Sequence, residues 1–373
     1  MKITIKRTEE QVELLKAMAS KNRDVAYEAQ MALAEFIGPV LAKVINQAPT
    51  LSNLFTQFQF SADDSPTIPL DLYYDITDED YIQVWSQTVA GGLPSNTATP
   101  TQSEMKFTTY RLDSAVDFDK RYAQRMRLDV VSKTFTRLAQ EVLLKQERNS
   151  AALIFGALAE AGTRGHGHII GTDNAGRLSL NDFNRLMTRS KRIDTAWTGG
   201  TPEGGFSSGV TDLIVSPEVV QSLREIAYNP VNTRTGPGSS DNGIAATDSM
   251  RDSVYQNAGI PEFYGINILE LQEMGKGQRF NKIFDTQAGS NRMELPVGSH
   301  GTFSDGSHEI VLGLNKSKES LLRAVATDAE TGSEMSLMAD DQYSVRQNKI
   351  GYYGSLEEGR MILDDRALYG ITV

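Results

Sequence analysis

Residues 122–161 carry the hydrophobic periodicity of one long helix, and no other feature constrains the fold as strongly. At about 1.5 Å per residue, forty residues reach about 60 Å, which exceeds most helices of globular proteins. The pattern therefore predicts a helix that acts as a spine for the rest of the chain. Its apolar positions recur at steps of three or four residues: Leu128, Val131, Phe135, Leu138 and Val142.

Two β-rich segments, residues 67–89 and 105–118, flank a stretch that has no charged side chain. This stretch, residues 90–103, is rich in glycine, proline, serine and threonine, a composition typical of a loop tip. The simplest prediction is a long two-stranded hairpin. Because an isolated two-stranded hairpin is marginally stable in water, we expect it to lie on something outside itself.

Helical periodicity also runs through residues 8–47, ahead of the predicted hairpin. Thr8 and Gln11 have the spacing of a capping box. Gly38 and Pro39 interrupt the run, and proline is favoured at the first position of a helix. We therefore predict two helices, the second of which begins at Pro39.

Residues 179–342 have the mixed signals of an α/β segment. Ser179 and the run Ser216-Pro217-Glu218 are typical of helix starts. Residues 228–243 contain Asn-Pro, Gly-Pro-Gly and Asp-Asn-Gly, which indicates a long loop. Buried strands are predicted at four places: Leu213–Val215, Ile266–Leu271, Ile310–Leu314 and Leu321–Ala326.

The last residues, 343–373, are rich in β-forming side chains. We predict a strand, a polar turn around Ser355–Gly359, and a closing strand from Met361 that ends buried in a sheet. The whole pattern indicates an α+β fold in five successive segments. Their predicted bounds are 1–66, 67–121, 122–178, 179–342 and 343–373.

Composition excludes several classes of function. The chain has 373 residues, a net charge of −11 and no cysteine. The absence of cysteine excludes disulfides, thiolate metal sites and cysteine nucleophiles. The negative net charge disfavours a protein that binds nucleic acid over its whole surface. The first residues lack the pattern of a secretory signal, and no stretch approaches the roughly 20 apolar residues of a membrane span, so we expect synthesis and function without export or membrane insertion.

Residue patterns that carry chemistry are weak. Residues 205–209 match G-x-S-x-G by letter, but the motif needs a strand before it and a helix after it. His166 and His168 form the only histidine pair, and the glycines that flank them favour a turn over a metal site. We predict no catalytic, cofactor-binding or metal-binding residue, and no enzyme activity.

The order of these elements, together with three stretches of sequence, resembles the HK97-type major capsid protein of tailed bacteriophages. Residues 212–220 resemble the family's axial-domain strand and the "SPE"-type helix that follows it. Residues 343–354 and 365–369 resemble its terminal strands. The resemblance implies that the five segments are an N-terminal helical arm, an E-loop hairpin with its base, a peripheral domain with a spine helix, an axial domain with connecting strands, and return strands.

The resemblance also implies a function. It is that of a structural virion protein, not an enzyme, which assembles as pentamers and hexamers into an icosahedral shell in the host cytoplasm. The shell would enclose double-stranded DNA without sequence-specific binding. The implied contacts between subunits lie at the hairpin tip, Gly91, Gly92, Leu93 and Pro94, and in the axial loop, Asn232, Arg234 and Arg251.

Further partners follow from the same resemblance. Only about 65 residues precede the hairpin, fewer than a fused scaffolding domain needs, so a separate scaffolding protein is implied, besides a portal and a decoration protein. Two alternatives remain open. One is the shell of an encapsulin-like compartment, which would enclose cargo protein, and the other is an α/β enzyme without a recognisable site.

Overall fold

The computed structural model describes most of the chain, and it falls into two compact units. Unit 1 comprises residues 1–68, 105–150 and 321–361, and unit 2 comprises residues 69–104, 151–320 and 362–373. The two units do not test the five successive segments that the sequence predicts, because each unit is made of stretches that are separated in the sequence. The five segments therefore stay a prediction. The described residues are 9–48, 50–61, 65–69, 104–163, 167–173, 176–198, 209–228, 262–263, 265–288, 303–327, 332–340 and 347–373.

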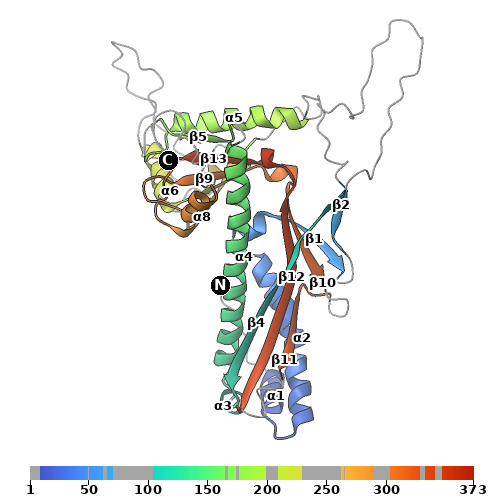
Figure 1. The fold of residues 1–373 in the computed structure, drawn as a ribbon. Helices are drawn as coiled ribbons and strands as arrows, with labels where there is room; N and C mark the ends of the chain where they lie inside the picture. The colour runs from blue at the N-terminus through green and yellow to red at the C-terminus, as the bar shows by residue number, and fades with distance from the viewer. Residues whose placement is uncertain are drawn as a thin grey trace, which may run out of the picture. The chain divides into compact units, whose positions relative to one another are not determined.

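Unit 1 is built from helices that pack on one face of a five-stranded sheet (Figure 1). The sheet has the order β1-β10-β12-β11, and β4 pairs with β12. The helix α4 begins in unit 1 and continues into unit 2. The elements of unit 1 are α1 (Glu9–Met18), α2 (Arg23–Asn46), the 3-10 turn η1 (Leu51–Leu54), β1 (Thr56–Ser61), β4 (Thr109–Asp119), α3 (Lys120–Gln124), α4 (Leu128–Thr163), β10 (Leu321–Thr327), β11 (Met335–Asp340) and β12 (Lys349–Ile362).

Alternation along β12 and β4 explains why this sheet has one buried face. Tyr352 lies opposite Val116, and Leu356 lies opposite Leu112, so these side chains share one face. The ring of Phe135, from the predicted long helix, meets Tyr352 edge-on at 5.2 Å between centroids. The expected long helix is confirmed as α4, and its apolar stripe covers this face of the sheet. Its predicted start at residue 122 is wrong, because α4 begins at Leu128 and residues 120–124 form the separate helix α3.

The predicted break of the N-terminal helices at Gly38 and Pro39 is wrong. The helix α2 runs through both residues, and the break comes before it, where the side chain of Asn22 accepts a hydrogen bond from the Asp24 amide. Gly38 explains how the helix continues. It has no Cβ to clash with the ring of the following proline, and an added Cβ would lie 3.4 Å from the Met335 carbonyl oxygen of β11.

The predicted hairpin is only partly described, and its returning strand is not a simple hairpin arm. The short strands β2 (Thr67–Pro69) and β3 (Glu104–Lys106) pair as a two-stranded sheet, while residues 70–103 lie outside the described part. From Thr109 onward the chain joins the five-stranded sheet as β4. The reason is that the apolar face of β4 is completed by β12 and the helices, which a hairpin partner alone does not supply.

The predicted turn at Ser355–Gly359 is also wrong. The strand β12 continues through these residues, and the chain turns only after it, at the 3-10 turn η5 (Asp365–Ala367). The polar composition of residues 355–359 suggested a turn, but Glu358 is fully buried and faces buried arginines in the sheet. The prediction that the last residues are buried in a sheet is confirmed, since Leu368–Thr372 form the buried strand β13.

Unit 2 contains a six-stranded mixed sheet of the order β5-β13-β9-β6-β8-β7. Predicted helix starts are confirmed at Ser179, which exchanges hydrogen bonds with Asp182, and at Ser216, whose hydroxyl accepts from the Val219 amide. The expected α+β class is confirmed. The remaining elements of unit 2 are β5 (Ile169–Gly171), α5 (Leu180–Thr198), β6 (Asp212–Val215), α6 (Pro217–Tyr228), β7 (Glu262–Phe263), β8 (Ile266–Glu270), α8 (Arg279–Ala288), β9 (Ile310–Leu314) and the 3-10 turn η4 (Lys316–Lys318).

In the described part of the chain, no helix combines the length and the apolar character that a membrane crossing requires.

Candidate functional site

The contact residues that the family resemblance implied cannot be placed. Gly91, Gly92, Leu93 and Pro94 at the hairpin tip lie outside the described residues. The axial-loop residues lie outside them too, and so do His166 and residues 205–208. These contact residues stay predictions. His168 is described, and its imidazole Nδ1 lies 2.8 Å from the Leu368 carbonyl oxygen in a buried position. The axial-loop set is Asn232, Arg234 and Arg251.

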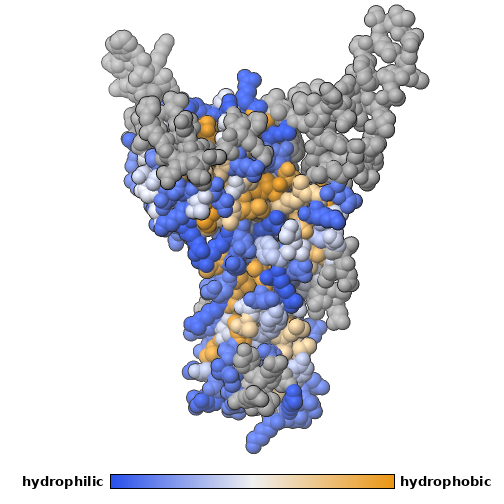
Figure 2. Space-filling view, viewed as in Figure 1, coloured by the Kyte–Doolittle hydropathy of each residue, from blue (hydrophilic) through white to orange (hydrophobic). Residues whose placement is uncertain are grey.

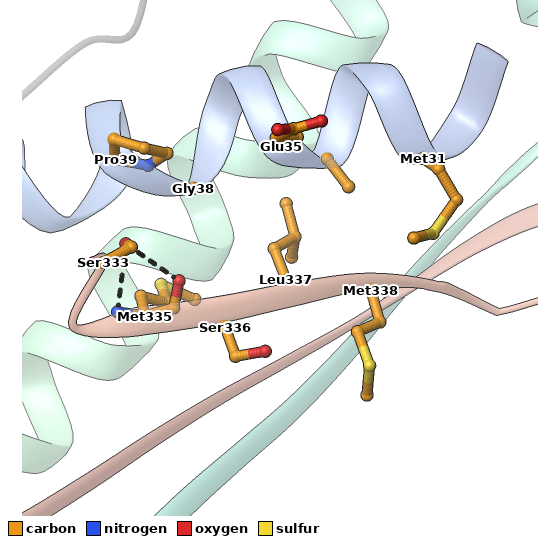
Figure 3. A pocket seen from close by; sticks show the side chains of 10 residues that line it. Met31, Glu35, Gly38, Pro39, Ser333, Met335, Ser336, Leu337 and Met338 are labelled. Carbon is orange, nitrogen blue, oxygen red and sulfur yellow. Dashed lines mark hydrogen bonds between the residues drawn. The ribbon is translucent and has the colours of Figure 1, made fainter. Parts of the chain in front are cut away.

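A shallow groove of about 310 Å³ lies in unit 1 between α2 and β11. Figure 3 shows Leu337 pointing toward α2 and Met338 pointing away from it, while Met31 reaches down from the helix. Met31 and Met338 are 40% and 48% exposed. The lining residues are Met31, Ala34, Glu35, Gly38, Pro39, Ser333, Met335, Ser336, Leu337 and Met338.

This groove lacks the chemistry of an active site. Glu35 is the one charged residue in its lining, and Ser333 hydrogen bonds with the backbone of Met335. Figure 2 shows one face of the molecule, on which hydrophilic side chains predominate and hydrophobic ones form separated patches. Among the described residues, no group of three or more histidine and acidic side chains is placed to hold a metal ion.

The most concentrated polar arrangement in unit 1 is a buried charge cluster around Glu358. Its carboxylate forms salt bridges with Arg323 at 2.9 Å and Arg360 at 3.1 Å. It also accepts hydrogen bonds from Tyr110 at 2.7 Å and from Gln146 at 3.0 Å. Glu358, Arg323 and Arg360 are 0%, 3% and 2% exposed at their side chains. One carboxylate thus joins β12, β10, β4 and α4.

Arg360 extends the cluster toward the segment that follows α2. Its guanidinium donates to the hydroxyls of Ser52 and Ser150, each at 2.6 Å, and lies over the Phe55 ring at 5.2 Å. Nearby, Glu147 of α4 accepts hydrogen bonds from the Leu51 and Ser52 amides at 3.1 and 3.2 Å. These contacts therefore fix η1, and Phe55 directly after it, to α4 and β12.

A second contact of this kind fixes the end of α2 to β10. Arg323 donates to the Asn46 side-chain oxygen at 3.1 Å, and Asn46 donates to Glu334 at 2.9 Å. Because these groups are spread over strands and helices that are distant in sequence, the cluster can form only in the folded unit. The cluster is structural, since most of its polar groups are hydrogen bonded to other groups of the protein, while Gln146 Oε1 and Arg323 Nη2 are buried without a partner in the described part of the chain.

Electrostatics support the ionised form of Glu358. Burial by itself disfavours a carboxylate, but the guanidiniums of Arg360 and Arg323 outweigh it and hold the pKa of Glu358 below its usual value. Burial, followed by the negative charge of Glu358, raises the pKa of the Tyr110 phenol. Tyr110 therefore stays protonated and continues to donate its hydrogen bond.

A different carboxyl group is buried in unit 2. Glu309 is 3% exposed and accepts a hydrogen bond from Ser216 at 2.8 Å. Burial raises the pKa of Glu309, and the neighbouring Glu218 adds to this effect, while Ser216 and Lys276 oppose it. Ser216 is also the cap of α6, so this pair joins the residue that precedes β9 to the start of that helix.

Sequence reasoning missed Glu358 and Arg360, although a signal was present. Tyr352, Gly354 and Leu356 share one face of β12, and Glu358 and Arg360 continue the same two-residue period. Read as a strand, this period places both charged residues on the core side. The polar composition of residues 355–359 concealed it.

Comparisons with known proteins give matches only among solved structures. No family model matches the chain, and no curated protein does. The capsid of the Cyanophage P-SCSP1u is 13% identical, with 85% of this chain and 86% of that chain covered and a TM-score of 0.46. The virus-like particle from Pyrococcus furiosus is 13% identical, with 93% and 99% covered and a TM-score of 0.41.

A third similar structure is the holo-SrpI encapsulin complex from Synechococcus elongatus PCC 7942, at 13% identity, coverage of 86% and 85%, and a TM-score of 0.43. At these identities and TM-scores the likeness extends to the fold and no further, so the functional argument rests on this chain's own residues. The three similar structures are thus a phage capsid, a virus-like particle and an encapsulin complex.

Proposed function

We propose that this chain is the major capsid protein of a tailed bacteriophage, a structural subunit that assembles as pentamers and hexamers into an icosahedral shell around double-stranded DNA. The observation that carries the proposal is the β2–β3 pair. Within the described residues these two strands pair only with each other, apart from both larger sheets. A two-stranded ribbon is marginal by itself, and a neighbouring subunit would supply the surface that it needs.

The order of elements supports the same proposal. Two helices precede the ribbon, the long helix α4 follows it, and the chain runs through most of unit 2, returns to unit 1 over residues 321–361, and closes unit 2 with β13. This is the order that the resemblance to HK97-type capsid proteins implies.

The partners named by the resemblance belong to the same proposal. They are a separate scaffolding protein, a portal and a decoration protein, with assembly in the host cytoplasm and the DNA held by enclosure. Contacts of Gly91, Gly92, Leu93 and Pro94 with a neighbouring subunit are part of it as well. Heterologous contacts that close into rings are the general route to such capsomers.

Negative-stain electron microscopy and sedimentation velocity on the purified chain test the proposal. We expect closed polyhedral shells, tubes or capsomer-sized rings. A monomer or small dimer that persists with crowding agents and a scaffolding protein would contradict it. Shells isolated from the native source that contain nucleic acid support the phage capsid, whereas shells that contain a cargo protein would favour the encapsulin alternative.

A further inference from the structure

A long stretch of this acidic chain has an excess of positive charge. Residues 120–148, which form α3 and the part of α4 in unit 1, hold eight basic and three acidic residues. Their net charge of +5 leaves −16 for the rest of the chain, against a total of −11. An asymmetry of this size produces a local field that attracts anions even though the whole protein is acidic.

The basic side chains of this stretch are mostly exposed and unpaired. Lys120 donates a hydrogen bond to the Ser20 carbonyl oxygen, and Arg121 forms a salt bridge with Asp119. Of the other six, Arg148 is half-buried, and the remaining five form no ion pair with any residue that the structure describes. We call these five exposed side chains the basic surface: Arg125, Arg127, Lys133, Arg137 and Lys145.

Their arrangement follows from the helix. Lys133 and Arg137 lie one turn apart on the exposed side of α4, and Lys145 lies two turns beyond Arg137. Arg125 and Arg127 occupy the turn between α3 and α4, at the start of the same helix (Figure 1). From Arg127 to Lys145 the helix rises about 27 Å, close to one turn of duplex DNA at about 34 Å.

The composition of the basic surface favours a phosphate backbone as its partner. Three of its five members are arginines, whose forked guanidinium suits phosphate oxygens. The residues between them on the exposed side of α4 are polar or acidic, among them Asp129, Gln140 and Glu141. Among the described side chains of this stretch, Tyr122 of α3 is the one exposed large aromatic, at 41%. A protein interface would carry several apolar anchors at its centre, and a single-strand site would carry a series of aromatic platforms.

We propose that the basic surface of α3 and α4 binds the phosphate backbone of duplex DNA without regard to sequence. The inference rests on the proposed function, because it assigns the face of the shell subunit that meets the enclosed DNA. Asp129 and Glu141 interrupt the positive charge and keep the binding weak, so DNA held against this surface is still able to move.

The test is the binding of a fluorescent 30-bp duplex to the purified full-length chain between 50 and 200 mM salt, measured by anisotropy. The double variant Lys133→Gln/Arg137→Gln removes two charges of the basic surface. The matched control, Arg279→Gln/Lys282→Gln, removes two exposed charges from α8 in unit 2. Because each lost phosphate contact changes the slope of log K against log salt by about 0.9, we expect a slope less steep by about 2 for the first variant and no change for the control.

Equal binding by the wild type and the first variant would overturn the inference, and so would an equal loss in the control. Displacement of the duplex by polyglutamate of the same total charge would overturn the assignment to a phosphate backbone. Should the first variant fail to fold, Arg125→Gln/Arg127→Gln replaces it. Electron microscopy of the same samples separates the two proposals, since shells without DNA binding refute only the inference, and DNA binding without shells refutes only the proposed function.

Discussion

Arg323 and Glu358 form a salt bridge of 2.9 Å in which both side chains are almost completely buried. Taking two charges out of water is costly, and their attraction offsets this cost only when the remaining hydrogen-bonding groups are also satisfied. Here Arg360, Tyr110 and Gln146 supply those groups to the carboxylate. We therefore expect the stability of unit 1 to depend on this contact between β10 and β12.

Replacing Arg323 by methionine leaves Glu358 buried with one fewer partner. We expect the free energy of unfolding to fall by about 3 kcal/mol, the lower end of the range for breaking a buried ion pair, because Arg360 still faces the carboxylate. Chemical denaturation followed by circular dichroism measures this. The control is Arg111→Met, which breaks an exposed pair with Asp113 and should cost less than about 1 kcal/mol. Equal losses in the two variants would show that the buried bridge has no special role.

Stability should fall in acid because of Glu358. Its pKa is held below the usual value in the folded chain, so its ionised form contributes stability above the unfolded-state pKa of about 4.3. That stability is lost as the pH falls through the lower, folded-state pKa. In Glu358→Gln we expect lower stability at pH 7 and a weaker dependence on pH below about 4.3, measured as thermal midpoints. A variant with the same pH profile as the wild type would contradict this.

Gly359 lies where β12 approaches the backbone closely. A Cβ at this position would lie 3.0 Å from the Thr108 carbonyl oxygen and 3.4 Å from the Phe107 Cβ. We expect Gly359→Ala to destabilise unit 1 by about 1–3 kcal/mol, because backbone atoms cannot move aside as a flexible side chain can. Gly306→Ala, which meets no atom within 4 Å, is the matched control in the same unfolding assay. A neutral Gly359→Ala would mean that the strand relaxes freely.

Pro39 is tolerated within α2 at a cost. Proline has no amide hydrogen, so the Glu35 carbonyl oxygen loses its partner in the helix. Because the side chain of Pro39 is exposed, Pro39→Ala should restore this hydrogen bond and raise the free energy of unfolding by about 1–3 kcal/mol. Denaturation midpoints measure the gain, and a loss of stability would show that the ring of Pro39 contributes packing that the helix requires.

Local signals in the sequence determined several elements of this protein. The apolar period of residues 128–142 predicted α4, and Ser216 with Pro217 predicted the start of α6. The hydroxyl of Ser216 indeed caps the Val219 amide. Such features could be predicted because the interacting groups lie within a few residues of one another, so the pattern and its physical cause are contained in one short stretch.

Tertiary structure decided what those local signals left open. The polar residues 355–359 form a buried strand because Glu358 meets Arg323, 35 residues away, and Tyr110, 248 residues away. Pro39 lies within the helix α2, which packs closely on β11 at Gly38. In each case the deciding energy comes from charge pairing and packing between groups that only the folded chain brings together, and a sequence pattern of one segment does not contain the partner.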